Sequence, residues 1–377
     1  MNAKKTTKPP AAAAAAAFDL AHNDAFTIAA YGTTAFRSAC PKLAAFDIDG
    51  TLIRPKGKTV FPKSLDDWQW ICEAVKPGLR KAVADDGFDI VFITNQKKMS
   101  SDDVKAKAAM LYADLQVPFV LVAGHADDYY RKPHTGLWKV VVEQLAHGCV
   151  DVKHSFFVGD MDTDAAFAHN VGLEFKPAAA YWNLVGAAAG KPIPEYQHPL
   201  DGVVVVGEKD YARPRGGGKH LIVTVGPAAS GKSLIAARLA AAGGGYVVIN
   251  QDTLKTPAKQ KASFVKAVAA GQSIIVDNTN PLPATRAQWI EAAKAAGYFA
   301  TIVFIDVPKK AAQYLNEYRY EVSGGQTSHV PAVAYNVYYS KLVRPEPSEA
   351  DEVVTETQIL VKDEAARNKL TEMHFVV

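Results

Sequence analysis

The chain has 377 residues, of which 49% are apolar, and its 42 Lys and Arg against 39 Asp and Glu give a net charge of +3. This length favours two globular domains with tails, and so small a net charge neither requires nor excludes a nucleic-acid partner. No apolar run approaches the roughly twenty residues that cross a membrane. The three cysteines, Cys40, Cys72 and Cys149, are widely spaced, which gives no metal-binding pattern and fits a reducing compartment. We therefore expect a soluble intracellular protein.

The N-terminal part of the chain carries scattered lysines, Pro9-Pro10 and an alanine run, which predict a disordered tail over residues 1–35. From residue 36 to 185, apolar strands alternate with helical patterns. We predict strands at 43–46, 90–94, 119–122 and 155–158, and helices near 79–85, 102–115 and 136–147. This alternation is typical of an α/β domain with a doubly wound parallel sheet.

Residues 186–218 are rich in Gly and Pro and are interpreted as a linker. A second alternation occupies 219–377. We predict strands at 221–225, 246–250, 274–277 and 301–307, and helices after Gly231, over 262–270 and over 285–296. The second domain is therefore also predicted to be a doubly wound α/β sheet, with a candidate edge strand at 358–361.

Polar residues follow the four predicted strands of the first domain, at the edge where an open α/β sheet binds its ligands. Asp47 and Asp49, just before Gly50-Thr51, suit a phosphoryl transfer in which one carboxylate attacks phosphorus and the other handles the leaving-group proton. The later strand ends supply a hydroxyl and backbone N–H groups for phosphate, a cation, and acidic oxygens for Mg²⁺. These groups are Thr94-Asn95, Arg131-Lys132-Pro133, and Asp160 with Asp162 and Asp164.

Each of these segments taken singly also occurs in turns and surface loops, so the interpretation depends on their order at successive strand ends. That order resembles the haloacid dehalogenase superfamily of phosphatases. The resemblance implies that Asp47 is the nucleophile and Asp49 the general acid/base, and that Thr94 and Lys132 hold the phosphate. It also implies a Mg²⁺ site made by Asp47, Asp160 and the Asp49 backbone. The further metal ligand is assigned to Asp164, with Asp162 as the alternative.

The spacing of these motifs also bears on the substrate. About forty residues separate Thr51 from Ile90, and about forty separate Thr94 from Lys132, most of them needed for the sheet and its helices. No large lid domain fits in either place, so we expect an open site. An open site suits a phosphate on the end of a large molecule better than an enclosed small metabolite.

A phosphate-binding loop follows the first predicted strand of the second domain. The run Gly-Pro-Ala-Ala-Ser-Gly-Lys-Ser lies between a strand and a helix, and this context disfavours the alternative of a structural glycine-rich turn. Glycines let the backbone N–H groups surround phosphate oxygens, the lysine reaches the β- and γ-phosphates, and the last serine offers a hydroxyl to Mg²⁺. The candidate nucleotide-binding residues are Gly226, Ser230, Gly231, Lys232 and Ser233.

A carboxylate, Asp252, lies at the end of the next predicted strand. It can accept the proton of an attacking hydroxyl, which a kinase requires and a simple ATPase does not. Capping of the following helix is the alternative, and one residue can serve both roles. The segment 277–281 places further polar groups near the phosphates, and Arg286 and Arg319 are candidates for a lid over ATP, although an arginine in a helix is more often solvated.

The chain as a whole, from about residue 36 to 345, resembles the polynucleotide kinase 3′-phosphatase family, with the phosphatase before the kinase. The resembling segments include 46–52, 92–96, 130–133, 156–160, the phosphate loop, 250–254 and 277–281. The resemblance implies a DNA repair enzyme that removes 3′-phosphates through an aspartyl-phosphate and phosphorylates 5′-hydroxyl ends with ATP, using Mg²⁺ in both sites. It implies Asp252 as the kinase base, Arg319 as a lid arginine, DNA ends as the partner with RNA left open, and a nuclear or mitochondrial location.

Two departures from that family are visible. No forkhead-associated domain precedes the phosphatase, so binding to a phosphorylated scaffold is not expected, and Gln251 stands where the family often has arginine.

We expect a monomer. Two alternatives remain: a small-molecule kinase/phosphatase fusion, which a large lid would favour, and a non-catalytic repair scaffold, which loss of Asp47, Lys232 or Asp252 would favour.

Overall fold

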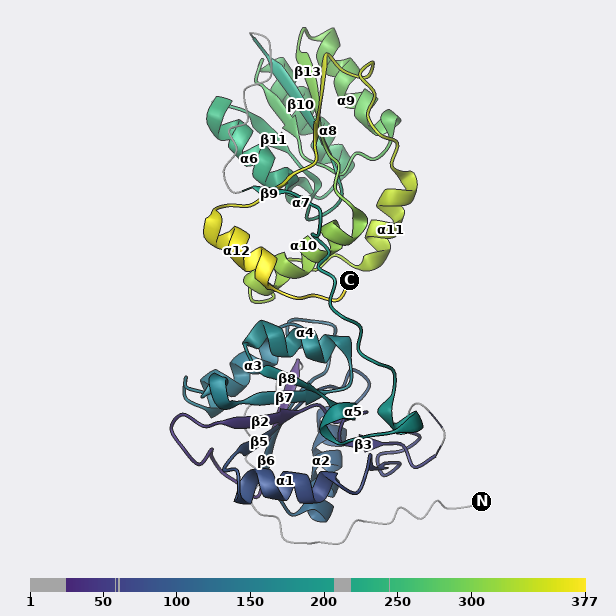
Figure 1. The fold of residues 1–377 in the computed structure, drawn as a ribbon. Coiled ribbons are helices and arrows are strands. Elements are labelled where there is room, and N and C mark those ends of the chain that lie inside the picture. The colour runs from purple at the N-terminus through teal and green to yellow at the C-terminus, as the bar shows by residue number, and fades with distance from the viewer. Residues whose placement is uncertain (1–24, 58, 60–61, 207–217, 244) are drawn as a thin grey trace, which may run out of the picture. The chain divides into compact units, whose positions relative to one another are not determined.

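The computed structural model describes residues 25–57, 59, 62–206, 218–243 and 245–377. The chain divides into two compact units, Met1–Tyr196 and Gln197–Phe375 (Figure 1). Each unit is built on a mostly parallel sheet with helices on both faces, so the predicted fold class is confirmed. Among the described residues, no helix is long and apolar enough to cross a membrane.

The first unit contains a six-stranded sheet in the order β1-β6-β5-β2-β7-β8. Its strands are β1 (Phe26–Tyr31), β2 (Leu43–Phe46), β5 (Asp89–Asn95), β6 (Phe119–Gly124), β7 (Phe156–Gly159) and β8 (Glu174–Pro177). β1 pairs antiparallel with β6, and the other neighbours are parallel. The central strands are almost wholly apolar because both of their faces are buried.

Helices cover both faces of this sheet. One face packs on α1 (Val75–Ala84), α2 (Ser101–Leu115) and α5 (Ala178–Tyr181), and the other on α3 (Gly136–Val140), its π-helical continuation Val141–Leu145, and α4 (Asp162–Val171). A small hairpin of β3 (Ile53–Arg54) and β4 (Gln69–Trp70) follows β2, and 3₁₀ turns lie at Val152–His154 and Gly186–Ala189. The segments between the phosphatase motifs thus form a short hairpin, helices and sheet strands.

The second unit contains a five-stranded parallel sheet in the order β11-β12-β10-β13-β14. Its strands are β10 (His220–Val225), β11 (Val247–Ile249), β12 (Ile274–Val276), β13 (Phe299–Ile305) and β14 (Glu352–Glu356). One face packs on α6 (Lys232–Gly243), α10 (Lys309–Val322) and α12 (Glu364–Glu372), and the other on α8 (Pro257–Ala269) and α9 (Pro283–Ala295). The remaining elements are α7 (Gln251–Leu254), α11 (Ala332–Lys341) and the paired strands β9 (Val205–Val206) and β15 (Ile359–Leu360).

The predicted tail is wrong at its C-terminal end. Residues Phe26–Tyr31 form β1, and Phe26, Ile28 and Ala30 are buried in the core. The segment is short and contains two alanines, so its sequence resembles the alanine-rich stretch before it, whereas the free edge of β6 supplies the partner that makes it a strand. Residues 1–24 of the predicted tail lie outside the described residues.

The linker is also shorter than the predicted range of 186–218. Leu200 and Val205 are buried in the second unit, and β9 pairs with β15, so residues 197–206 belong to that fold. Residues 207–217 lie outside the described residues. The candidate edge strand at 358–361 contributes β15 to this small pair, whereas β14, which is polar at both ends, forms the edge of the main sheet.

Cys40 and Cys149, for which the sequence showed no paired spacing, form a disulfide with their Cα atoms 4.8 Å apart. The two residues are 109 positions apart, and only the folded sheet brings their loops together. Cys72 is a free thiol. Widely spaced cysteines therefore gave no sign of this pair.

Candidate active sites

The phosphatase motifs converge at the carboxyl edge of the first sheet. Asp47 follows the central strand β2, Thr94 and Asn95 end β5, and Asp160 follows β7. β5 and β7 flank β2 on opposite sides, so helices leave this edge in two directions and open the crevice where α/β folds bind ligands. The loop after β6 adds Lys132 from the next strand outward.

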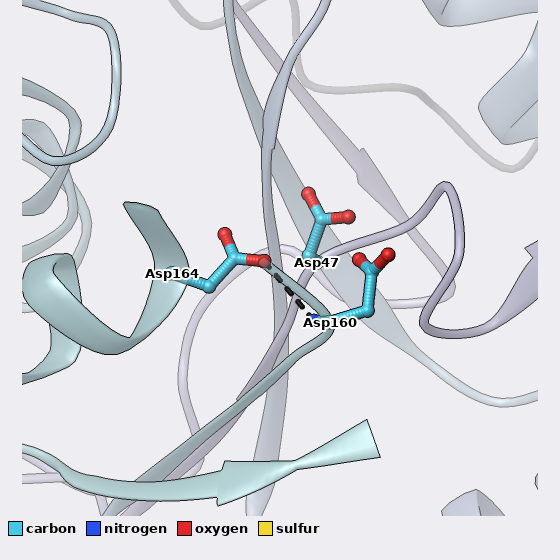
Figure 2. A group of neighbouring side chains, drawn as sticks. All are labelled: Asp47, Asp160 and Asp164. Atoms are coloured by element: carbon cyan, nitrogen blue, oxygen red, sulfur yellow. Dashed lines mark hydrogen bonds between the residues drawn. The ribbon is translucent and has the colours of Figure 1, made fainter. Parts of the chain in front are cut away.

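Three carboxylates meet in this crevice. One oxygen each of Asp47, Asp160 and Asp164 lies within 4.8 Å of the others, and Figure 2 shows the three side chains converging. Asp164 is held there because its Oδ2 accepts the N–H groups of Asp160 at 3.2 Å and Met161 at 3.1 Å. Asp162 lies outside the cluster and accepts the N–H of Thr163 at 2.8 Å. Of the two alternatives for the further ligand, the structure brings Asp164 to the site.

Lys132 is the cation at the centre of the site. Its ammonium lies 2.8 Å from Asp47 and 2.7 Å from Asp164, and it donates to the carbonyl of Ile93 at 2.9 Å. Burial by itself would lower the pKa of this lysine, but the two carboxylates outweigh burial and raise it. Asn95 positions the lysine: its side chain accepts the Lys132 N–H at 3.0 Å and donates to the Lys132 carbonyl at 3.3 Å.

Burial and the neighbouring carboxylates raise the pKa of two aspartates in the site. Burial raises the pKa of Asp47 to about 7, with Lys132 opposing the rise and Asp164 and Asp160 adding to it. Burial together with Asp164 raises the pKa of Asp160 to about 6. Three carboxylates against one lysine leave an excess of negative charge among oxygen donors, which is the ligand set that Mg²⁺ prefers.

Asp49 lies beside this cluster and is held by two residues that the sequence analysis did not single out. Its Oδ1 accepts Lys107 of α2 at 2.7 Å, and its Oδ2 accepts Gln96 at 2.7 Å. Gln96 also donates to Thr94 Oγ1 at 3.0 Å, which links the predicted acid/base to the predicted phosphate holder. The sequence could have indicated Lys107, because this lysine falls on the buried face of α2 next to Ala108.

A glycine is required at position 50, directly after Asp49. Its φ is +85°, and a Cβ at this position would lie 2.3 Å from Asp160 Oδ2. A side chain here would displace the carboxylate. The Asp-Gly-Thr sequence is thus explained by close approach of the β2 loop to the β7 loop.

The phosphate loop of the second unit connects β10 to α6. Gly231 has a φ of +90°, and Lys232 is buried with its ammonium 2.5 Å from the carbonyl of Pro227. Burial lowers the pKa of Lys232 to about 8, against the opposing effect of Asp277. Ser230 Oγ is buried and has no hydrogen-bond partner within the described residues. An orphaned hydroxyl beside a lysine and glycine-rich backbone fits phosphate oxygens.

Asp277, at the end of β12, was not assigned a role from the sequence. Its Oδ2 accepts the Ser233 hydroxyl at 2.6 Å, and Oδ1 accepts Thr224 at 3.3 Å. A serine hydroxyl and a carboxylate at this point of a phosphate loop are the pair that holds Mg²⁺ in such sites. The sequence feature that could have indicated Asp277 is its position at the end of a strand beside the phosphate loop.

Asp252 and Arg319 also act on the pKa of Lys232, which Arg319 lowers and Asp252 raises. Asp252 is exposed on α7, and Asn250 rather than Asp252 caps that helix, accepting Thr253 N–H at 2.8 Å. Arg319, on α10, donates to the Ser328 carbonyl at 2.8 Å, and its Nε is buried without a partner in the described chain. Gln251 is exposed, and its N–H donates to Asn278.

Arg286 is not a lid residue, which corrects the sequence interpretation. It is fully buried on α9, pairs with Glu349 at 2.6 and 2.7 Å, and donates to the carbonyls of Asn280, Pro281 and Val343. All these partners are structural. The helical pattern did not reveal them because Glu349 and Val343 come from the C-terminal segment.

Comparison with known proteins identifies relatives of the first unit. The family model described as polynucleotide kinase 3 phosphatase matches residues 42–182. The polynucleotide 3'-phosphatase ZDP of Arabidopsis thaliana is 29% identical over 169 residues, which are 37% of this chain and 24% of that protein. Among solved structures, Kti12 of Chaetomium thermophilum in complex with ADP-AlF3 matches 40% of this chain and 95% of its own, at 18% identity and a TM-score of 0.30.

A longer match covers both units. The bifunctional polynucleotide phosphatase/kinase of Schizosaccharomyces pombe is 30% identical over 336 residues, which are 85% of this chain and 80% of that protein. Its match extends over far more of the chain than the phosphatase region alone. The chain belongs to the bifunctional polynucleotide phosphatase/kinase family.

Proposed function

We propose that this enzyme heals DNA ends by removing a 3′-phosphate in its first unit and phosphorylating a 5′-hydroxyl with ATP in its second. The observation that supports the proposal is that each unit holds residue types that a phosphoryl transfer uses: Lys132 paired with Asp47, and Asp49 anchored by Lys107, in the first unit, and the phosphate loop with Lys232 and Asp252 in the second. The products are a 3′-hydroxyl and a 5′-phosphate, the ends that a polymerase or a ligase uses.

In the phosphatase reaction, Asp47 attacks the phosphorus and the bond to the 3′-oxygen breaks. Asp49 gives a proton to that oxygen, which leaves an aspartyl-phosphate on Asp47. Asp49 then takes a proton from water, whose oxygen attacks the phosphorus as the bond from the Asp47 oxygen to phosphorus breaks, which releases inorganic phosphate. Lys132 stabilises charge on the nucleophile and the phosphate, and its two ion pairs fix the carboxylate that attacks.

In the kinase reaction, Asp252 takes the proton of the 5′-hydroxyl, whose oxygen attacks the γ-phosphorus of ATP as the bond to the β-phosphate oxygen breaks. Lys232 and the loop N–H groups bind the β- and γ-phosphates, and Arg319 neutralises charge that develops during transfer. Asp47, Asp160, Asp164 and the Asp49 backbone would hold Mg²⁺ in the first site, and Ser233 with Asp277 in the second. When bound, the ion supplies charge neutralisation on phosphate oxygens.

The test uses one oligonucleotide that carries a 5′-hydroxyl and a 3′-phosphate, assayed with and without ATP. We expect Asp47→Ala to abolish phosphate release while 5′-phosphorylation continues, because the nucleophile serves only the first site. We expect Lys232→Ala to do the reverse, since its charge serves only the ATP phosphates.

Loss of both activities in either variant would contradict the two-site mechanism. Phosphate release from small phosphomonoesters, but not from the oligonucleotide, would favour the small-molecule alternative. Absence of both activities in the unsubstituted protein would favour the scaffold alternative.

A further inference from the structure

A disulfide joins the two segments that lead into neighbouring strands of the first unit. Cys40 lies three residues before β2 begins, and Cys149 lies seven residues before β7 begins. β2 and β7 pair in parallel inside the sheet, with Ala44 opposite Phe156. The bond therefore ties together the amino ends of two paired strands, although its cysteines are 109 positions apart in the sequence.

The opposite ends of the same two strands carry the phosphatase site. Asp47 directly follows β2, and Asp160 directly follows β7. Each strand has only four residues, which span roughly 13 Å. The Asp47 N–H donates to the Val158 carbonyl at 2.9 Å, so the pairing of the strands continues into the site. The contacts that hold β2 against β7 thus also hold the predicted nucleophile beside a predicted metal ligand.

Hydrogen bonds cross the same junction without using the sulfur atoms. The Asp151 N–H donates to the Pro41 carbonyl at 2.9 Å. Buried Ser155 accepts the Leu43 N–H at 2.8 Å and donates to the Asp151 carbonyl at 2.6 Å. We therefore expect the unit to stay folded and active at moderate temperature when the bond is open. The bond adds a constraint on the unfolded chain, because closing so long a loop lowers its conformational entropy.

The bond is accessible in the folded protein. Both Cys40 and Cys149 are exposed, in loops that precede their strands. Thiol–disulfide exchange requires a thiolate to reach one of the two sulfur atoms, and this exposure allows it without unfolding. In reducing compartments disulfides are rare, and those that form are usually transient, with catalytic or redox-sensing roles.

The distribution of cysteines confines this chemistry to one unit. The third cysteine, Cys72, is a half-buried free thiol that packs against the core beneath α1 and α2. Residues 197–377, which form the second unit, contain no cysteine. A reductant can therefore act on the first unit alone, and the kinase of the same chain reports any general effect.

We propose that Cys40 and Cys149 form a reversible redox site that sets the thermal stability of the phosphatase unit and that a dithiol reductant opens. A thiolate of the reductant attacks one cysteine sulfur, the S–S bond breaks, and the other cysteine leaves as a thiolate. The second thiol of the reductant attacks the mixed disulfide and frees the first cysteine. Two electrons and two protons pass to the protein, and the reductant becomes a disulfide. The phosphatase, but not the kinase, thus depends on the redox state of its surroundings.

The experiment compares the full chain after treatment with oxidised glutathione and after treatment with dithiothreitol. Peptide mass spectrometry should find Cys40 linked to Cys149 in the first sample, and dithiothreitol should free both cysteines without denaturant. We then measure the midpoint temperature at which each activity is lost. On reduction, the midpoint for 3′-phosphate release should fall by about 5 to 15 °C, and the midpoint for 5′-phosphorylation should not move.

Cysteine variants provide matched controls. Cys40→Ser/Cys149→Ser should behave as the reduced protein in either treatment, and Cys72→Ser should respond to dithiothreitol as the unsubstituted protein does. Failure of the Cys40–Cys149 link to form, reduction only in denaturant, an unchanged phosphatase midpoint or an equal fall of both midpoints would overturn the inference. Calorimetry of the same samples detects the fall of one transition in the absence of either activity, so failure of the proposed function is distinguished from failure of the redox site.

Discussion

Lys107 is a buried cation whose ammonium holds the predicted acid/base, Asp49, at 2.7 Å. We expect Lys107→Met to lower kcat for release of the 3′-phosphate by on the order of 10- to 100-fold, because an unanchored Asp49 delivers its proton less efficiently. Lys107→Arg should retain part of the activity. The kinase activity of the same preparations should be unchanged.

The leaving group distinguishes positioning of Asp49 from a general structural effect of Lys107. p-Nitrophenyl phosphate releases a stable anion and needs little proton transfer, so its hydrolysis should fall much less than that of the oligonucleotide. An equal loss with both substrates would show that Lys107 does not act through Asp49.

The carboxylate cluster makes the stability of the first unit depend on pH and on metal. Asp47 and Asp160 have a pKa of about 7 and about 6 in the fold, against an ordinary value of 3.8. The folded state therefore binds these protons more tightly than the unfolded state, so the cluster's contribution to stability falls as pH rises from about 4 to about 7. We expect the Tm in EDTA to fall over this range and Mg²⁺ to restore it at neutral pH.

A matched pair of variants isolates this effect from other titrations. Asp160→Asn should flatten the pH dependence and remove most of the response to Mg²⁺, whereas Asp162→Asn, outside the cluster, should behave as the unsubstituted protein does. An undiminished response to Mg²⁺ in Asp160→Asn would exclude this carboxylate as a ligand.

At the scale of elements, Arg286 joins α9 to the C-terminal segment. We expect Arg286→Met to lower the free energy of unfolding of the second unit by about 3–5 kcal/mol, because Glu349 loses its partner and three carbonyls lose a donor. Calorimetry of the full chain measures this. Arg344→Met, whose pair with Asp306 is exposed at the arginine, should cost about 0–1 kcal/mol. A raised KM for ATP without loss of stability in Arg286→Met would instead indicate a lid role.

The elements that the sequence predicts well are those whose pattern is local. β2, β5, β6 and β10 are continuous apolar runs that end in polar motifs, so both the strands and the residues at their ends are visible in the sequence. β8 and β14 were missed because edge strands tolerate polar residues such as Glu174 and Lys176.

The parts of the sites that sequence does not predict depend on contacts between distant segments. Lys107 meets Asp49 across 58 positions, Asp277 meets Ser233 across 44, and Arg286 meets Glu349 across 63. The sequence places Lys107 on the buried face of α2 and Asp277 at a strand end, but it does not show which residue each of them meets. The role of each appears only when the sheet order brings the two segments together.

At the scale of the whole molecule, each unit has cores of its own on the two faces of its sheet. We expect two calorimetric transitions. A non-hydrolysable ATP analogue with Mg²⁺, at about a hundred times its Kd, should raise one of them by roughly 5 to 10 °C. Beryllofluoride with Mg²⁺, which mimics a phosphoryl group on an aspartate, should raise the other.

The two active-site variants serve as controls for this assignment. Lys232→Ala should lose the response to the ATP analogue alone, and Asp47→Ala the response to beryllofluoride alone. A single transition that both ligands raise would contradict independent units.

β1 has a consequence for how the protein is made. It is the first described strand, yet its partner β6 begins at Phe119. A ribosome adds about 5 to 20 residues per second. Roughly 5 to 20 seconds therefore pass between synthesis of the apolar run Phe26–Tyr31 and synthesis of its partner strand β6. The nascent sheet can therefore grow from β2 and β5 and accept β1 only once β6 has been made. Newly made chains therefore pass through a stage at which this strand is open to chaperones and to other nascent chains.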